Sequence, residues 1–314
     1  MIGKGAFGKV KLVHIVSNPS KLYAMKVIKK EQKKRVIAPQ RGPRKQVALT
    51  QEETINREVA IMKKMRHPNI VKLREVIDDT SKKKLYMILE FVKGGPCFIE
   101  DQEPFSEDKA RADIRDIIAG ISYMHKNHIV HHDIKPDNIL RKEDDTIKIC
   151  DFGVSSYYED MTTLITTVKG TPPFIPPEAV NPITVKNGYL PSLADIYAIG
   201  VTLFMFIYGH LPYDEENKYN LYKSVINNPI PFDKEENKEI TSRISSDLRN
   251  LLEGTLEKDP QKRFTIEQLK QHPWVTCNGT LPLPEELDEV NITKGELDTA
   301  LTPMLPLNEI KIQT

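Results

Sequence analysis

The apolar positions of the first 92 residues fall mainly into short runs bounded by polar turns. Lys11–Val16 and Leu22–Ile28 are rich in Val, Ile, Leu and Tyr, and Ser17-Asn18-Pro19-Ser20 separates them. Runs of this composition around a turn are typical of paired antiparallel strands. Two further runs, Ile70–Ile77 and Leu85–Phe91, predict a second strand pair.

A helical pattern interrupts these strands. Thr50-Gln51-Glu52-Glu53 has the spacing of a capping box, and Ile55, Val59 and Met62 follow at helical intervals before Pro68. The pattern predicts one amphipathic helix. Residues 1–92 are therefore expected to form a five-stranded antiparallel sheet with one main helix.

The later part of the chain has mostly helical patterns. Ser106 is a candidate N-cap before Glu107, and apolar residues recur at helical spacing from Ile114 to Met124. Further patterns predict helices over Ser192–Tyr208, Tyr219–Ile226, Ser245–Leu256 and Thr265–Lys270. The apolar run Ile196–Tyr208 is shorter than the about 20 residues that span a bilayer, which indicates a buried core helix.

Lys93–Phe105, which begins with Lys93-Gly94-Gly95-Pro96, has the composition of a hinge between these two regions. We therefore expect an α+β fold with two lobes. The small sheet lobe would cover residues 1–92 and the larger, mainly helical lobe residues 93–274. Residues 275–314 would form an acidic tail, since Leu281–Thr314 carries seven acidic residues against two lysines.

Composition excludes several classes of protein. The 314 residues hold 45 Lys and Arg against 44 Asp and Glu, so no overall field favours nucleic acid or a membrane surface. The start of the chain lacks the pattern of a signal peptide. Three widely spaced cysteines, Cys97, Cys150 and Cys277, show no metal-ligand rhythm. We expect a cytoplasmic protein with reduced thiols, with the nucleus as a second location.

One segment is strongly basic. Lys26–Lys45 holds nine Lys or Arg and one acid, with Pro39, Gly42 and Pro43 among them. Residues 29–49 are therefore expected to form a basic insert rather than a core element. Basic residues alone carry no base readout and no recognition motif accompanies them, so we expect no nucleic-acid partner.

The first chemical motif is Gly3-Lys4-Gly5-Ala6-Phe7-Gly8, whose glycines let backbone N–H groups approach phosphate oxygens. A β-run follows it instead of the helix of a dinucleotide site, which favours a flap over nucleotide phosphates. Lys26 in the next strand is placed to hold phosphates, and Glu58 in the predicted helix is its candidate carboxylate partner. Without such a partner, Lys26 would be an ordinary surface lysine.

Two motifs in the helical region are decisive: His131-His132-Asp133-Ile134-Lys135-Pro136-Asp137-Asn138 and Asp151-Phe152-Gly153. Either motif alone would be compatible with an ordinary turn. With the glycine flap, Lys26 and Glu58, however, they follow the order and spacing of a eukaryotic protein kinase, which residues 2–274 resemble.

The resemblance implies roles for these residues. Asp133 would orient the acceptor hydroxyl and take its proton, and Lys135 would contact the transferred phosphoryl group. Asn138 and Asp151 would hold two magnesium ions that bridge the phosphates of ATP. Hard oxygen ligands and positive charge suit a reaction in which the protein forms no covalent bond.

The resemblance also implies how adenine is bound. Backbone groups of Glu90 and Val92 would contact the base, with Leu89 as the gatekeeper. The apolar walls of the nucleotide pocket would be Ile2, Val10, Ala24 and Leu140.

Further phrases resemble the helical lobe of the family. Gly170-Thr171-Pro172 is similar to the end of an activation segment and, with Lys135, matches the Ser/Thr-specific pattern. Pro176-Pro177-Glu178 departs slightly from the usual Ala-Pro-Glu. By resemblance, Glu178 would pair with Arg263, and Asp195 would hold the backbone of the catalytic loop.

A closer resemblance is to the calcium/calmodulin-dependent protein kinase kinase group. Its mark is a basic insert with a phrase like Pro39-Gln40-Arg41-Gly42-Pro43, and His272-Pro273-Trp274-Val275-Thr276 is also similar. The group phosphorylates activation-loop threonines of other kinases, so such kinases are the implied protein substrates. The insert would help to recruit them, or it is simply a solvated loop. The group's basic calmodulin-binding helix has no counterpart here, so we expect no calmodulin dependence from this chain.

Two features depart from the family pattern. His132 stands where most members have an arginine that grips a phosphorylated activation loop, and an ordinary histidine is largely neutral at pH 7. We hypothesise that activity does not require phosphorylation of Thr162, Thr163, Thr166 or Thr167. The alternative function is a pseudokinase scaffold that binds nucleotide and partner kinases without turnover. Most of the family's usual first strand, before the glycine motif, is also absent. We therefore expect either that the chain is a fragment of a longer protein or that its sheet lobe is less stable than in relatives.

Overall fold

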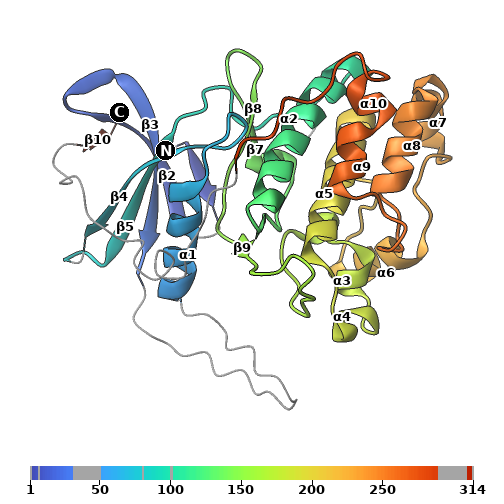
Figure 1. The fold of residues 1–314 in the computed structure, drawn as a ribbon, viewed down its shortest axis with the longest axis horizontal. Helices are drawn as coiled ribbons and strands as arrows, with labels where there is room; N and C mark the ends of the chain where they lie inside the picture. The colour runs from blue at the N-terminus through green and yellow to red at the C-terminus, as the bar shows by residue number, and fades with distance from the viewer. Residues whose placement is uncertain are drawn as a thin grey trace. The chain divides into compact units, whose positions relative to one another are not determined.

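A computed structural model describes residues 2–5, 8–30, 51–79, 81–99, 102–288 and 310–312. Most of the predicted basic insert, from residue 31 on, lies outside the described residues. The chain divides into two compact units, whose elements are drawn in Figure 1. The first unit holds the described residues up to Arg66, Val71–Phe91 and residues 310–312, and the second holds His67–Ile70 and residues 92–288.

The first unit is an antiparallel sheet with one helix. Its strands are β1 (Gly3–Gly5), β2 (Gly8–Ile15), β3 (Asn18–Lys29), β4 (Leu73–Asp79), β5 (Lys84–Glu90) and β10 (Ile310–Ile312). They lie in the order β1-β2-β3-β5-β4, and β10 pairs with β2. The predicted five-stranded sheet is confirmed, whereas the sixth strand, β10, was not expected from the sequence.

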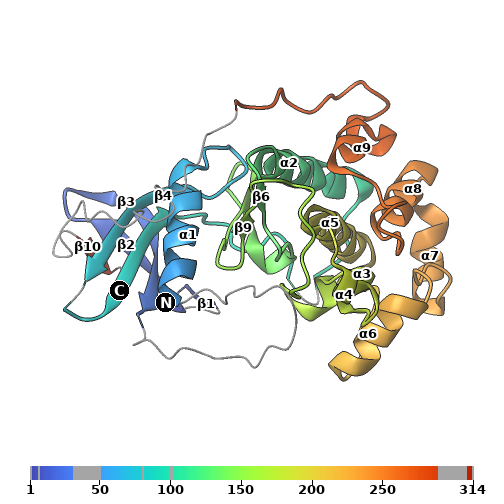
Figure 2. The ribbon, with the colours of Figure 1, turned by 60° about the horizontal axis from the view of Figure 1, so that its bottom comes forward.

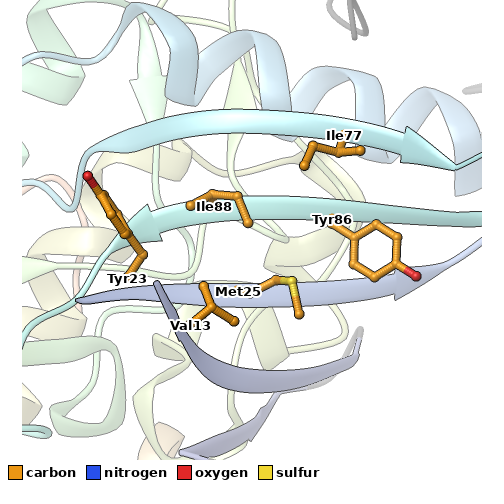
Figure 3. Packing of buried hydrophobic residues seen from close by; sticks show 6 residues of the cluster. All are labelled: Val13, Tyr23, Met25, Ile77, Tyr86 and Ile88. Atoms are coloured by element: carbon orange, nitrogen blue, oxygen red, sulfur yellow. The ribbon is translucent and has the colours of Figure 1, made fainter. Parts of the chain in front are cut away.

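Buried apolar side chains gather on one face of this sheet. Figure 3 shows this outer-face cluster, which consists of Val13, Tyr23, Met25, Ile77, Tyr86 and Ile88. Because successive strand residues point to opposite faces, Lys26 lies on the other face. Helix α1 (Gln51–Lys64) buries Ile55, Val59 and Met62, as their spacing predicted, while the candidate cap Thr50 lies outside the described residues.

The second unit is mainly helical, which confirms the α+β fold class. Its longer helices are α2 (Glu107–Lys126), α5 (Pro191–Tyr208), α6 (Lys218–Asn227), α7 (Glu235–Arg243), α8 (Ser246–Thr255) and α9 (Ile266–Gln271). Short helices are α3 (Pro177–Val180), α4 (Thr184–Asn187) and α10 (Pro273–Thr276). Four small strands form two antiparallel pairs: β6 (Ile129–Val130) with β9 (Ser156–Tyr157), and β7 (Ile139–Arg141) with β8 (Ile147–Ile149).

The four helices predicted between Ser192 and Lys270 agree with α5, α6, α8 and α9 to within one residue at each end. Ser106 caps α2 by accepting a hydrogen bond from the backbone N–H of Lys109, and Thr265 forms a capping box with Gln268 at the start of α9. Helix α7 was not predicted because its sequence is polar and only Asn237 is buried. The sequence of α7 therefore shows no apolar stripe at helical spacing from which a helix could be predicted.

Helix α5 is the predicted buried core helix. Among the described residues it is the one helix whose length and composition would suit a membrane span, and 78% of it is buried inside the protein. It packs against α2 and α8, which confirms that its apolar character serves the core of the second unit.

The predicted acidic tail is divided between the two units. In the second unit, residues 281–288 run alongside helix α2 (Figure 2). Arg115 of that helix donates a hydrogen bond to the carbonyl oxygen of Leu281 at 2.6 Å. Ser122 Oγ donates to Glu286 Oε1, also at 2.6 Å. Residues 310–312, by contrast, belong to the sheet of the first unit.

Candidate active site

A cluster of polar side chains surrounds Asp133 in the second unit. The side-chain nitrogen of Asn138 donates hydrogen bonds to the carbonyl oxygen of Asp133 at 2.8 Å and to its Oδ2 at 2.9 Å. The hydroxyl of Thr171 donates to Oδ1 of Asp133 at 2.7 Å. Lys135 Nζ donates to Thr171 Oγ1 at 2.6 Å and lies 3.2 Å from Asp133 Oδ2. Both carboxylate oxygens of Asp133 therefore have fixed partners.

The backbone that carries Asp133 is held by Asp195, from the first turns of α5. Its Oδ2 accepts a hydrogen bond from the N–H of His131 at 2.9 Å, and its Oδ1 accepts one from the N–H of His132 at 2.8 Å. His125 Nε2 is a third partner, at 2.9 Å from Oδ2. Burial raises the pKa of Asp195, but the hydrogen bond and charge of His125 bring that pKa below its usual range. Asp195 thus fills the role that the resemblance implied.

Asp151 lies two residues after Ile149, the last residue of β8. In that pair Ile139 lies opposite Ile149, and the N–H of Cys150 donates to the carbonyl oxygen of Asn138 at 2.9 Å. Asp151 is therefore adjacent, along the ladder, to the position opposite Asn138. His131 Nε2 also lies 3.0 Å from the carbonyl oxygen of Cys150, which ties this segment to the loop that carries Asp133.

The donor set of Asn138 and Asp151 suits a magnesium ion. Mg²⁺ prefers oxygen ligands, and it usually binds through one or two protein side chains together with water and phosphate oxygens. Since the Asn138 side-chain nitrogen is used by Asp133, its amide oxygen is the atom available to a cation. Among the described residues, no group of three or more His, Cys, Asp or Glu could hold a metal. A cation here would therefore need oxygens from a nucleotide or water as well.

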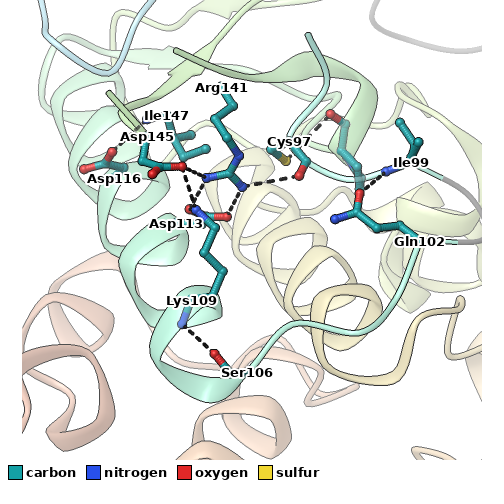
Figure 4. Close-up of polar contacts among 11 residues, drawn as sticks. Cys97, Ile99, Gln102, Ser106, Lys109, Asp113, Asp116, Arg141, Asp145 and Ile147 are labelled. Carbon is teal, nitrogen blue, oxygen red and sulfur yellow. Dashed lines mark hydrogen bonds and ion pairs between the residues drawn. The ribbon is translucent and has the colours of Figure 1, made fainter. Parts of the chain in front are cut away.

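Carboxylates of α2 fix the two strands that flank Asn138 and Asp151. Figure 4 shows Arg141 of β7 forming a double ion pair with Asp113, at 2.9 and 2.5 Å, and donating to the carbonyl oxygen of Cys97 at 3.3 Å. Asp116 accepts a hydrogen bond from the N–H of Ile147 in β8 at 2.8 Å. Asp113 is only 1% exposed, so these bonds anchor the hairpin to the core of the unit.

The first unit contains the predicted pair of Lys26 and Glu58. Lys26 Nζ lies 2.6 Å from Glu58 Oε1, and the two residues are 6% and 4% exposed. Lys26 lies in β3 opposite Val10 of β2 and Met87 of β5, while Glu58 comes from α1. Lys26 is therefore a buried, paired cation and not a surface lysine.

The glycine segment joins β1 to β2. Gly5 pairs with Gly8 in the ladder, and Ala6 and Phe7 between them lie outside the described residues. At Gly8 a Cβ atom would lie 1.9 Å from the carbonyl oxygen of Val27 in β3, so no side chain fits there. The close pairing of β2 with β3 therefore requires a glycine at position 8.

The other residues predicted to contact the nucleotide are divided between the units. Ile2, Gly3, Lys4, Val10, Ala24 and Glu90 belong to the first unit, and Val92 and Leu140 to the second. By strand alternation, Val10 and Ala24 share the sheet face of Lys26. Their role in nucleotide binding stays a prediction.

His132 is buried and neutral. Its Nε2 lies 3.1 Å from the hydroxyl of Tyr158, and the residue is 8% exposed. Burial, followed by the charge of Lys169, lowers the pKa of His132 from 6.5 to about 3. The structure therefore has a neutral imidazole at the position where the family usually carries a guanidinium.

The segment that ends at Thr171 is held close to the catalytic loop. At Gly170, where φ is +97°, a Cβ atom would lie 2.4 Å from the carbonyl oxygen of His132. The predicted pair of Glu178 and Arg263 is present as a buried double ion pair, with distances of 2.6 and 2.7 Å. It ties the end of the segment to the chain between α8 and α9.

Several contributing residues were not identified from the sequence. His125 and Asp113 are ordinary members of a helix by their spacing, and Lys169 looks like one more surface lysine, although it donates to Ser156 Oγ at 2.5 Å. Their partners lie 13 to 70 residues away in the chain. A search of the sequence for polar residues in phase with the apolar stripe of α2 would have found Asp113 and His125, and both positions are buried in the structure.

Comparison with known proteins adds independent findings. The family described as the protein kinase domain matches residues 1–275. The chain is 35% identical over 313 residues to a calcium/calmodulin-dependent protein kinase kinase of Caenorhabditis elegans, covering 96% of this chain and 56% of that protein.

Two further relatives are named serine/threonine-protein kinases. The chain is 36% identical over 310 residues to ssp1 of Schizosaccharomyces pombe, covering 95% of this chain and 45% of that protein. It is 37% identical over 278 residues to GRIK1 of Arabidopsis thaliana, covering 88% of this chain and 65% of that protein. The chain thus spans about half the length of the curated relatives that it matches.

Proposed function

This chain belongs to the protein kinase family, and from that premise we propose that it transfers the γ-phosphoryl group of ATP to Ser or Thr hydroxyls of proteins. The two relatives named serine/threonine-protein kinases agree with the sequence-based assignment to that class. The observation that carries the proposal is the arrangement around Asp133, in which a fixed carboxylate is bonded to Thr171 and lies beside Lys135.

Asp133 is suited to orient the substrate hydroxyl that accepts the phosphoryl group. A carboxylate with both oxygens held by neighbours keeps one orientation, so it can align a substrate hydroxyl and take up its proton. The ammonium of Lys135, 3.2 Å from Asp133 Oδ2, supplies positive charge where negative charge on the transferred group develops. Thr171 would position both side chains.

ATP and magnesium are the implied co-substrate and cofactor. Asn138 and Asp151 would hold the metal, which neutralises charge on the phosphates of the nucleotide. Lys26, fixed by Glu58, would hold phosphates as a point charge. The glycine segment from Gly3 to Gly8 would offer backbone N–H groups to phosphate oxygens.

The proposed substrates are activation-loop threonines of other protein kinases. This narrower assignment draws support from the Caenorhabditis elegans relative, which is named a kinase of a protein kinase. The phrases near Pro39 and His272 that resemble this group support it as well. Recruitment by the basic insert belongs to the same proposal.

The test uses this chain, magnesium-ATP and a catalytically inactive kinase of the AMP-activated or calmodulin-dependent type. Transfer followed by mapping of the modified residue should identify an activation-loop threonine. The control is Asp133→Asn, which should bind nucleotide but transfer no phosphate. Transfer only to generic protein substrates would retain the kinase and overturn the narrower assignment.

The rival function is a pseudokinase scaffold that binds nucleotide and partner kinases without turnover. Nucleotide binding by both the natural chain and Asp133→Asn, with no transfer by either to any substrate, would favour it. The buried Lys26–Glu58 pair and the fixed Asp133 favour the active enzyme, because a scaffold has no need of either.

A further inference from the structure

Strand β10 lies at the edge of the sheet in the first unit, beside β2. Ile310 pairs with Ile15, Lys311 with His14 and Ile312 with Val13, and the pairing is antiparallel. Both Figure 1 and Figure 2 draw this C-terminal strand next to the long β2–β3 hairpin. The last described residues of the chain are therefore part of the sheet that carries the glycine segment.

β10 continues the line of β1. Both strands pair with the same edge of β2 and run antiparallel to it, β1 opposite Gly8–Val10 and β10 opposite Val13–Ile15. Two ladder positions, opposite Lys11 and Leu12, separate them. If the register of β1 were continued backward, the three positions before residue 1 would face Val13, His14 and Ile15. Ile312, Lys311 and Ile310 occupy those ladder positions.

The side chains of β10 match the place that they fill. Ile310 packs against the outer-face cluster, beside Ile15 and near Val13, which is fully buried. Lys311 and Ile312 are both exposed, so Ile310 makes the apolar contact of this strand. Without β10, the edge of β2 at Val13–Ile15 would present unpaired backbone groups and an uncovered margin of the apolar cluster.

We propose that the edge of β2 at Val13–Ile15 is a strand-docking site, occupied by residues 310–312, whose occupancy steadies the glycine segment. β2 connects the two sites directly, because Gly8 begins it and Ile15 ends it. Backbone pairing along both edges limits the twist and bending of a strand, so a docked β10 restrains the turn at Gly8. The occupant is an extended segment with apolar residues on alternate positions and a polar one between them.

The consequence for nucleotide binding rests on the proposed function, whereas docking itself does not. Hydrogen exchange tests docking first. A chain that ends at residue 309 should exchange the backbone amides of Leu12–Val16 faster by about tenfold or more, since edge amides lose their partners. Exchange in helix α2 of the second unit is the internal control and should not change. Unchanged protection of Leu12–Val16 would overturn the proposal.

Two substitutions guard against an effect of shortening alone. Ile310→Asp places a charge over the outer-face cluster and should reproduce the faster exchange. The matched change Lys311→Asp alters an exposed position of the same strand and should leave protection of Leu12–Val16 near that of the natural chain. Equal effects from the two substitutions would contradict docking through the apolar face.

An N-terminal extension tests whether a different segment can take the place of β10. Adding Ile-Lys-Ile directly before Met1 would supply the same side chains at the same three ladder positions. In the extended chain, truncation at residue 309 should no longer accelerate exchange at Leu12–Val16. If truncation acts equally in both backgrounds, the two segments do not share a site and the proposal fails.

Nucleotide binding is measured last, by titration with magnesium-ATP. The truncated chain should bind ATP several times more weakly than the full chain, and the Ile-Lys-Ile extension should restore the affinity. If the full chain binds no ATP, the proposed function fails while the exchange results still decide docking. If exchange changes and ATP affinity does not, the link between β10 and the glycine segment is wrong.

Discussion

Thr171 Oγ1 donates a hydrogen bond to Asp133 Oδ1 at 2.7 Å, and the same hydroxyl accepts one from Lys135 at 2.6 Å. Thr171→Val keeps the shape but removes both bonds, so Asp133 and Lys135 lose their relative orientation. We expect kcat to fall by about tenfold to a hundredfold, with nucleotide affinity little changed. Thr171→Ser, which keeps the hydroxyl, should retain most of the activity. Equal kinetics of the Val and Ser variants would contradict this positioning role.

Variants of the buried Lys26–Glu58 pair should affect stability and activity differently. Glu58→Leu removes the carboxylate partner of a buried ammonium and should destabilise the protein by about 3–5 kcal/mol. The double variant Lys26→Met/Glu58→Leu removes both charges and should recover most of that loss in calorimetry. Neither variant should transfer phosphate. A double variant as unstable as Glu58→Leu would show that the pair is not what destabilises the single one.

Arg263 and Glu178 form a pair whose side chains are 0% and 3% exposed. Arg263→Ala leaves a buried carboxylate without its double ion pair, so unfolding of the second unit should become easier by about 3–5 kcal/mol. Trp274, the single tryptophan, is buried in that unit, so its fluorescence reports the unfolding transition. Arg243→Ala breaks an exposed pair with Glu239 and should change stability by about 0.5 kcal/mol or less. Similar shifts from both would contradict the role of burial.

The low pKa of His132, about 3, predicts a pH dependence of stability. The unfolded state takes up a proton near pH 6.5 and the folded state does so only near pH 3, so stability falls as the pH falls through this window. One such group contributes a slope of at most about 1.4 kcal/mol per pH unit.

His132→Gln should therefore flatten the curve of unfolding free energy between pH 6.5 and 3. The measurement is denaturant unfolding at several pH values, with His210→Gln at an exposed position as the control. Parallel curves for the natural chain and the His132→Gln variant would show that His132 takes up its proton over the same pH range in the folded and unfolded states, which would contradict the lowered pKa.

The segment that carries Thr162, Thr163, Thr166 and Thr167 has a buried anchor, Ile165. Ile165 is 4% exposed and exchanges two backbone hydrogen bonds with Tyr189, each at 2.9 Å, whereas Thr162, Thr163, Thr166 and Thr167 are exposed. Replacing all four threonines by alanine should leave activity within about threefold, because exposed substitutions cost little. Ile165→Ala, which loosens the buried anchor, should reduce activity more. Loss of transfer in the fourfold variant, with folding intact, would contradict independence from phosphorylation.

Composition and the local spacing of apolar residues were sufficient to predict the helices and strands that bury most of their apolar side chains. The strands β2 and β5 are recognisable from their Val, Ile, Leu and Tyr content, and the helices α2 and α8 from the 3.6-residue period of a half-buried helix. Helix α7 buries little apart from Asn237, and β10 is three residues long, so neither has enough period to detect.

The candidate site was predictable to the extent that its residues lie in compact motifs. Asp133, Lys135 and Asn138 lie within six residues, and their chemistry is apparent from that phrase. The partners that fix them come from distant segments: Thr171 lies 38 residues from Asp133, and Asp195 lies 63 residues from His132. Their contacts arise from packing of the second unit, which no local period encodes.

Helix α5 holds the catalytic loop through one residue, so its rotational phase matters as well as its composition. Asp195 is its fifth residue, and each added residue turns a helix by about 100°. An insertion between Asp195 and the buried residues that follow it, such as Val201, would swing the carboxylate around the axis, away from the amides of His131 and His132. Apolar exchanges along α5 keep that angle. The number of residues between Asp195 and this buried part of α5 is therefore constrained, and an insertion there should abolish activity even when every inserted residue is a good helix former.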